Sequence, residues 1–208
     1  MEIAVWVVAT LFYLAFRVWY DGLGRPLTPQ EIEHFLQIIR EHADPGLDTR
    51  DIATLRRFME EDDGREFIMA NLIEFNDSPV THPDTGKEMS APALLAQYTK
   101  PFMGRILRQA GHPVIAGRGV GGYLDAWNTP PDPGWHMIGL VRYRSRRDAM
   151  SSSLADPAFA AIHKYKIAAI RQTLAFPAKT QVALYASPRV TVALVLALCA
   201  ALLQLALR

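Results

Sequence analysis

The chain has 208 residues, of which half are hydrophobic and 21% charged, and its formal net charge is +1. This length holds one ordinary domain with additional segments, and this composition excludes a chain that is disordered by default. A net charge so near zero also excludes the strong basic field of nucleic-acid-binding proteins, so we expect no nucleic-acid partner. The single cysteine, Cys199, cannot form an internal disulfide.

The two ends of the chain carry largely apolar runs, at residues 3–20 and 190–207. Arg17 is the only charge in the first run, and Gln204 is the only strongly polar side chain in the second. As helices, these runs of about 18 residues would be roughly 27 Å long, close to the ~30 Å hydrocarbon thickness of a bilayer. We therefore expect two transmembrane helices. The alternatives are a buried core helix for either run and a cleaved signal peptide for the first, although that run lacks a basic start.

The residues that flank these runs are typical of membrane anchors. Trp6, Trp19 and Tyr20 lie near the ends of the first run, where interfacial aromatic side chains gather, and Arg189 directly precedes the second. The distribution of Lys and Arg around the runs favours a cytoplasmic location for residues 21–189. The sequence thus predicts a multi-pass protein of the cell (inner) membrane, with the lipid bilayer as one partner.

Residues 28–60 are predicted to form two amphipathic helices. Thr28 and Glu31 have the spacing of a capping box, and apolar residues then recur at helical intervals to about residue 41. A second helix is expected from residue 48 to about residue 61. With the membrane runs, this gives four predicted segments: a transmembrane helix at 1–20, a helical extension at 21–65, an α+β domain at 66–187 and a transmembrane helix at 188–208.

From residue 66 onward, the pattern predicts a ferredoxin-like α+β domain with the order βαββαβ. The expected elements are a strand at 67–75, a helix at 91–110, one or two short strands within 114–127, a strand at 136–143, a helix that opens at Ser145 and restarts at Asp156, and a strand at 180–185. The first strand is apolar on both faces, so both faces of the sheet need cover. Either a second copy in a homodimer or the helices of residues 28–60 would provide it.

Several of these segments resemble the dimeric α+β barrel superfamily. The similar segments are MANLIEF at 69–75, RQAGH at 108–112, GLVRY at 139–143, the cap formed by Arg144 and Ser145, and ADPAF at 155–159. Within the superfamily, the chain looks most like short bacterial domains of unassigned function. The resemblance covers about residues 66–185, and it implies a dimeric barrel fold with a cavity between the sheet and its helices. Because its motifs are caps and turns, the resemblance bears on fold more than on activity.

The superfamily includes haem-degrading and small-molecule monooxygenases, haem peroxidases and muconolactone-isomerase-like enzymes, and fold does not select among them. Its haem-degrading members use an Asn in the first strand, which corresponds here to Asn71. Asn71 is polar within an apolar strand, so it would either orient a ligand or form hydrogen bonds within the core. By resemblance, His163 on the last helix would line the same cavity. The alternative is a surface histidine, since Lys164 and Lys166 flank it.

Three functions remain open from the sequence. The first is a module that binds a small apolar ligand or another protein, and this reading fits the lack of any acid–base motif. The second is a haem-using or cofactor-poor monooxygenase whose pocket includes Asn71, Tyr98, Tyr143 and His163. The third is a structural membrane protein that recruits a partner through residues 28–60. No motif specifies haem or a metal: no HExxH occurs, and no two histidines have helical ligand spacing.

Overall fold

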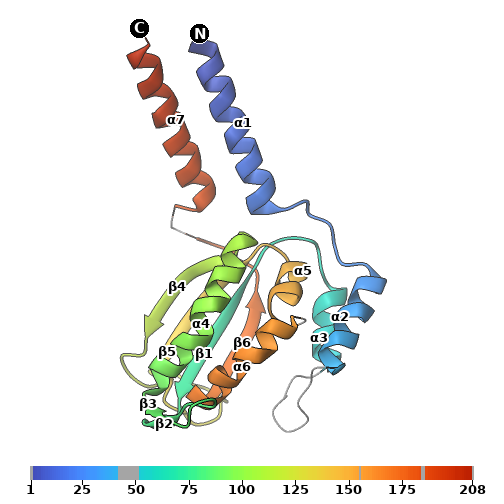
Figure 1. The fold of residues 1–208 in the computed structure, drawn as a ribbon, viewed down its shortest axis with the longest axis vertical. Coiled ribbons are helices and arrows are strands. Elements are labelled where there is room, and N and C mark those ends of the chain that lie inside the picture. The colour runs from blue at the N-terminus through green and yellow to red at the C-terminus, as the bar shows by residue number, and fades with distance from the viewer. Residues whose placement is uncertain (1, 42–51, 155, 184–185, 208) are drawn as a thin grey trace. The chain divides into compact units, whose positions relative to one another are not determined.

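The computed structural model describes residues 2–41, 52–154, 156–183 and 186–207 (Figure 1). The chain divides into two compact units. One consists of Met1–Leu23 together with Thr180–Arg208, and the other is Gly24–Lys179.

The first unit is a pair of apolar helices, α1 (Glu2–Asp21) and α7 (Pro188–Ala206). They pack antiparallel, because Trp6 Nε1 donates a hydrogen bond to Gln204 Oε1 at 2.8 Å, while Arg189 Nε donates to Asp21 Oδ1 at 2.7 Å. Both helices are long and apolar enough to cross a membrane, and only 6% of the most apolar window of each is buried. They are therefore unlike the core helix of a soluble domain, whose apolar side chains are enclosed by protein.

The second unit is built on a four-stranded sheet in the order β4-β5-β1-β6, in which all neighbouring strands are antiparallel. The strands are β1 (Phe67–Phe75), β4 (His112–Arg118), β5 (Met137–Tyr143) and β6 (Ile170–Ala178). A two-stranded hairpin of β2 (Val80–Thr81) and β3 (Glu88–Met89) lies in the predicted loop after β1. A helix connects β1 to β4, and β5 lies between these two strands in the sheet. This is the split β-α-β arrangement that the predicted element order requires.

Two helices, α4 (Ala91–Arg108) and α6 (Pro157–Ala169), lie side by side across one face of this sheet (Figure 1). The core lies between them and the odd-numbered side chains of β1, of which Phe67 and Phe75 are buried. Pro101 is accommodated inside α4, which remains one continuous helix. Between β5 and α6 the chain forms α5 (Arg146–Ala149) and the π-helical segment η1 (Met150–Leu154).

The prediction of the last strand was wrong. The strand is at Ile170–Ala178, and the described residues 180–183 are not in a strand. The helical spacing of Ile167, Ile170 and Leu174 conceals the end of α6 at Ala169. Pairing with β1 over most of its length determines the conformation of this segment, which shows that tertiary contacts override a local helical pattern. The glycine-rich segment at 114–127 likewise contributes only β4, which ends at Arg118.

The helical extension forms α2 (Pro29–Glu41) and α3 (Ile52–Glu60), while the predicted start of the second helix at residue 48 lies outside the described residues. The capping box at the start of α2 is confirmed: Thr28 N–H donates to Glu31 Oε2 at 2.8 Å, and Glu31 N–H donates to Thr28 Oγ1 at 3.3 Å. The hydrogen bonds from Thr28, aided by Arg147, lower the pKa of Glu31 to about 2.

These two helices bury their apolar stripes on the same side of the sheet as α4 and α6. Leu36, Ile39 and Met59 are fully buried in the common core, and the ring of Phe58 packs edge-on against Phe67. The described residues of this unit therefore leave the opposite face of the sheet uncovered. Its large apolar side chains remain 39–53% exposed; they are Ile115, Ile138, Leu174 and Phe176.

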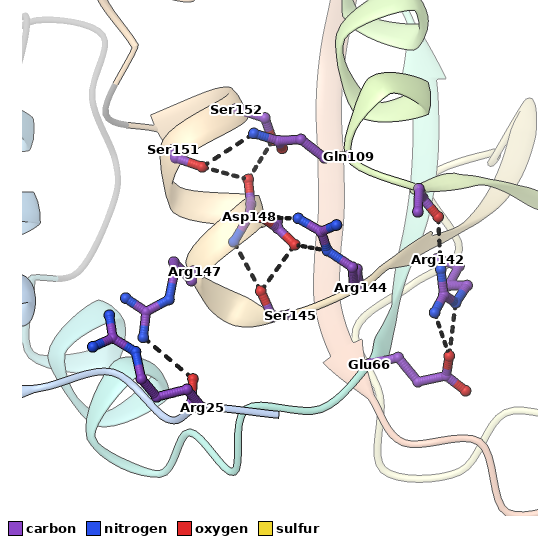
Figure 2. Close-up of polar contacts among 11 residues, drawn as sticks. Arg25, Glu66, Gln109, Arg142, Arg144, Ser145, Arg147, Asp148, Ser151 and Ser152 are labelled. Atoms are coloured by element: carbon purple, nitrogen blue, oxygen red, sulfur yellow. Dashed lines mark hydrogen bonds and ion pairs between the residues drawn. The ribbon is translucent and has the colours of Figure 1, made fainter. Parts of the chain in front are cut away.

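Buried polar groups hold the end of the sheet to α5 and to the end of α4 (Figure 2). Ser145 Oγ accepts a hydrogen bond from Asp148 N–H at 3.1 Å, which caps α5 as the sequence predicts. The Arg144 guanidinium donates two hydrogen bonds to the Asp148 carboxylate. In a second group, the almost completely buried Arg142 binds Glu66 through two nitrogens and donates to the carbonyl of Ala110 at 2.6 Å. Both groups serve the fold, because each joins segments that the chain must bring together.

Candidate functional site

Two buried tyrosines mark the interior between the sheet and its helices. Tyr98 extends from α4 and Tyr143 from the end of β5, and their exposed fractions are 9% and 7%. The Tyr98 ring lies 5.6 Å from Phe102 and 5.4 Å from Phe159, while Tyr143 stacks on Phe67 at 5.3 Å. Aromatic rings therefore surround both phenols and exclude water from most of their surface.

This environment disfavours the ionised form of both phenols. Burial raises the pKa of Tyr98 and of Tyr143 well above the ordinary range of tyrosine, and the nearby Tyr143 raises the pKa of Tyr98 further. Both side chains are thus neutral hydrogen-bond donors at any physiological pH. Among the described residues, neither hydroxyl forms a hydrogen bond within the protein, and each oxygen keeps some contact with solvent, since the fully enclosed side-chain atom without a partner there is Gln109 Oε1.

Lys166 on α6 adds a cation to this interior. Its Nζ lies 5.7 Å from the centroid of the Tyr98 ring, burial lowers its pKa, and no acidic partner faces it in the described part of the chain. Sequence reasoning took Lys166 only as evidence that His163 is exposed. The available signal was its position seven residues after Phe159, since side chains two helical turns apart share a face.

His163 is half-buried beside the same rings. Its imidazole stacks on Phe159 with ring centroids 5.8 Å apart, and it lies 6.1 Å from Tyr98. The structure therefore brings two of the four predicted pocket residues, Tyr98 and His163, into one aromatic cluster with Phe102 and Phe159, while the ring of Tyr143 packs with Phe67.

Asn71, the fourth predicted residue, lies at the centre of the sheet on the helix-facing side. Its Nδ2 donates to the carbonyl oxygens of Met69 at 3.1 Å and Gly139 at 3.3 Å. Since both neighbours are acceptors, the amide orientation is determined, and Oδ1 points away from them without a partner among the described residues. The cross-strand neighbours of Asn71 are the small residues Gly139 and Ala175, and a Cβ on Gly139 would meet nothing within 4 Å.

Nothing in the described ranges links Asn71 directly to the aromatic cluster, so the two are parts of one interior layer and not one contact network. Among those residues, no three His, Cys, Asp or Glu side chains come together to hold a metal ion. The predicted anchor residues lie elsewhere, in the helix pair. There Trp19 is 46% exposed, Tyr20 is buried, and the Arg189 guanidinium lies 4.9 Å from the Tyr20 ring centroid.

Comparison with known proteins finds a similar fold but no function. No family model matches the chain, and no curated protein matches it significantly. A protein of unknown function from Rhodopseudomonas palustris, solved as a structural genomics target, is similar over 66% of this chain and 98% of its own, with a TM-score of 0.54 and 20% identity. Its methylated form is similar over 67% and 97%, with a TM-score of 0.54 and 19% identity.

The class of protein is therefore an uncharacterised α+β domain with an apolar helix at each end of the chain. At this level of identity the likeness concerns the fold alone, so the site must be interpreted from its own chemistry.

Proposed function

We propose that the chain is a membrane-anchored domain of the dimeric α+β barrel type, and that it binds a small, largely apolar ligand between the sheet and helices α4 and α6. The observation that carries this proposal is a set of largely buried donors with no hydrogen-bond acceptor among the described residues: the hydroxyls of Tyr98 and Tyr143, and the ammonium of Lys166, which faces the Tyr98 ring.

The energetic argument is that such groups are costly unless something satisfies them. A buried polar group without a hydrogen bond costs about 1–3 kcal/mol. The two phenols and the amine are largely but not fully buried, so solvent offsets part of this cost, and incompletely satisfied donors of this kind are typical of functional sites. A ligand oxygen that accepts from these donors would offset that cost on binding.

The lining also defines the class of ligand. The hydroxyls of Tyr98 and Tyr143 and the ammonium of Lys166 donate hydrogen bonds. The rings of Phe102 and Phe159 provide apolar walls beside Tyr98. A ligand with an aromatic or aliphatic body and a carbonyl oxygen matches this arrangement. Asn71 Oδ1 offers an acceptor on the sheet side, next to the open space at Gly139, for a donor group on the same ligand.

The arrangement does not fit a haem group. His163 is the histidine that the family resemblance would make the axial ligand, but Tyr98 and Phe159 pack against its ring. Phe102 and Phe159 also contact each other, with centroids 5.6 Å apart, so these described side chains leave no flat slot for a porphyrin. A smaller organic ligand suits the interior better, and cofactor-poor oxygenation remains the alternative activity for such a ligand.

Membrane attachment is the second component of the proposal. It rests on the apolar character and exposure of α1 and α7 and on their antiparallel packing, which would place both chain ends on one side of a bilayer. Within the bilayer, the Trp6 to Gln204 hydrogen bond would satisfy the one strongly polar side chain of residues 190–206. We propose the cytoplasmic side of the cell membrane for the central domain, from the Lys and Arg bias.

The third component is a homodimer through the open face of the sheet. Two neighbouring cross-strand rows on this face are apolar from one edge to the other; the first contains Ile115, Leu140, Ala70 and Phe176, and the second Gly117, Ile138, Leu72 and Leu174. Neither row carries a charge, and a second copy would present the same rows in an isologous interface.

Ligand binding can be tested with two compounds that differ only in the acceptor oxygen, 2-acetylnaphthalene and 2-ethylnaphthalene. We expect only the ketone to raise the melting temperature of the detergent-solubilised full chain markedly, because only the ketone accepts from the buried donors. Lys166→Met should abolish that difference. Lys100→Met, a substitution at an exposed position on α4, should leave it intact.

An equal shift with both compounds, or no shift with either, would contradict the proposed site. So would an undiminished ketone effect in Lys166→Met, since the amine would then have no part in binding.

A further inference from the structure

A hollow lies at the far end of β1, where the long connection between β4 and β5 folds back on the sheet. It has a volume of about 540 Å³, within the range of pockets that bind small molecules. Its apolar surface comes from Phe75, Trp135 and Met137, its polar side chains are Arg118 and His136, and four glycines expose backbone along one wall.

The wall of this hollow is ordered by its own hydrogen bonds. The Asp132 carboxylate accepts from Tyr123 N–H at 2.7 Å and from Gly134 N–H at 2.9 Å, and the Tyr123 hydroxyl accepts from Trp135 Nε1 at 3.0 Å. A Cβ at Gly122 would lie 2.5 Å from Asp132 Oδ2, so the chain needs glycine for this close approach. The connection is thus a preformed wall despite its exposure, and little ordering would remain for a ligand to induce.

The charge of the hollow is one-sided. Arg118 has no acidic partner among the described residues, and the nearby carboxylate of Asp132 is occupied by backbone N–H groups. In the described part of the chain, no Asp or Glu lines the hollow. An unpaired guanidinium above an apolar floor favours an anion, and its planar fork matches a carboxylate in particular.

His136 supplies a second donor of defined orientation. Its Nδ1 lies 3.2 Å from Phe75 N, and a backbone N–H can only donate, so Nδ1 is the acceptor in this pair. The neutral ring therefore carries its proton on Nε2, which is the nitrogen left to donate to a ligand.

We propose that this hollow is a binding site for a small monocarboxylate with an aromatic or aliphatic body. Arg118 pairs with the carboxylate, His136 Nε2–H donates to it, and Trp135, Phe75 and Met137 hold the body. This site is separate from the interior site around Tyr98, and it stands whether or not that site binds a ligand.

Calorimetric titration of the detergent-solubilised full chain with phenylacetate tests this site, with neutral phenylacetamide as the matched compound. We expect saturable binding of the acid and much weaker binding of the amide. Arg118→Gln should weaken phenylacetate binding by about tenfold, which corresponds to the loss of roughly 1.4 kcal/mol of charge-assisted interaction. Arg65→Gln, which removes an exposed cation outside the hollow, should leave the affinity unchanged.

A second variant tests the location by filling the space. A Cβ on Gly121 meets nothing within 4 Å, so Gly121→Leu should fold normally and should abolish phenylacetate binding by occupying the hollow. Lys166→Met should not affect phenylacetate binding, which distinguishes this site from the interior one. Absence of saturable phenylacetate binding, equal affinity for acid and amide, or unchanged affinity in both Arg118→Gln and Gly121→Leu would overturn the proposal.

Discussion

Replacing Glu66 by alanine should destabilise the α+β unit by about 1–3 kcal/mol, because it removes a carboxylate that pairs with the buried Arg142 guanidinium, although the 37% exposure of the Glu66 side chain lets solvent screen part of the effect. The exposed fraction of the Arg142 side chain is 5%, and Glu66 binds it at 2.7 Å and 2.6 Å (Figure 2). The hydrogen bond to the Ala110 carbonyl satisfies one nitrogen but does not neutralise the charge. Denaturant unfolding of the detergent-solubilised chain, followed by circular dichroism, measures the effect.

The double variant Glu66→Leu/Arg142→Met is the control for this prediction. Removing both partners avoids an unpaired buried charge, so we expect the double variant to be more stable than Glu66→Ala. If Glu66→Ala unfolds at the same denaturant concentration as the natural chain, the pair does not stabilise this corner of the fold.

Membrane attachment should give an all-or-none result. We expect the natural chain to stay in the membrane fraction through alkaline carbonate and high-salt washes, because salt and pH disrupt electrostatic contacts but not the burial of apolar helices. The double variant Leu11→Arg/Leu198→Arg should shift the protein out of that fraction, since each central arginine costs about 2.5–3.5 kcal/mol on insertion.

The same variant separates a membrane span from a soluble helix pair. Leu11 and Leu198 are about 60% exposed in the protein itself (60% and 61%), so in water either position would accept an arginine without loss of packing. Recovery of the natural chain in the soluble fraction after mild lysis would contradict the proposed anchoring.

Segments with a strong local pattern were predictable from sequence. The strand at 67–75 was predicted with the bounds that the structure has. Its odd and even positions are both apolar and its neighbours are polar, which is typical of a strand buried on both faces. The caps at Thr28, Ser145 and Asp156 were equally predictable, since each side chain accepts from a backbone N–H two or three residues later.

Elements that depend on distant partners were not predictable in this way. The segment Ile170–Ala178 is a strand because β1 lies beside it, and no residue marks where α6 gives way to it. The candidate site shows the same limit. Asn71 and the tyrosines were identified by residue type. Spacing places Lys166 on the same face of α6 as Phe159, but that this face meets Tyr98 depends on the packing between α4 and α6.

The free energy of unfolding of Tyr143→Phe is the measurement that tests the central claim most directly. If the Tyr143 hydroxyl awaits a ligand, its removal takes away no hydrogen bond within the protein, and the variant should be as stable as the natural chain or more stable. Tyr165→Phe is the matched comparison and should lose stability measurably, because the Tyr165 hydroxyl donates to Asp84 Oδ2 at 2.6 Å. A loss of about 1 kcal/mol or more in Tyr143→Phe would mean that the protein itself satisfies this hydroxyl, and it would contradict the proposed ligand site.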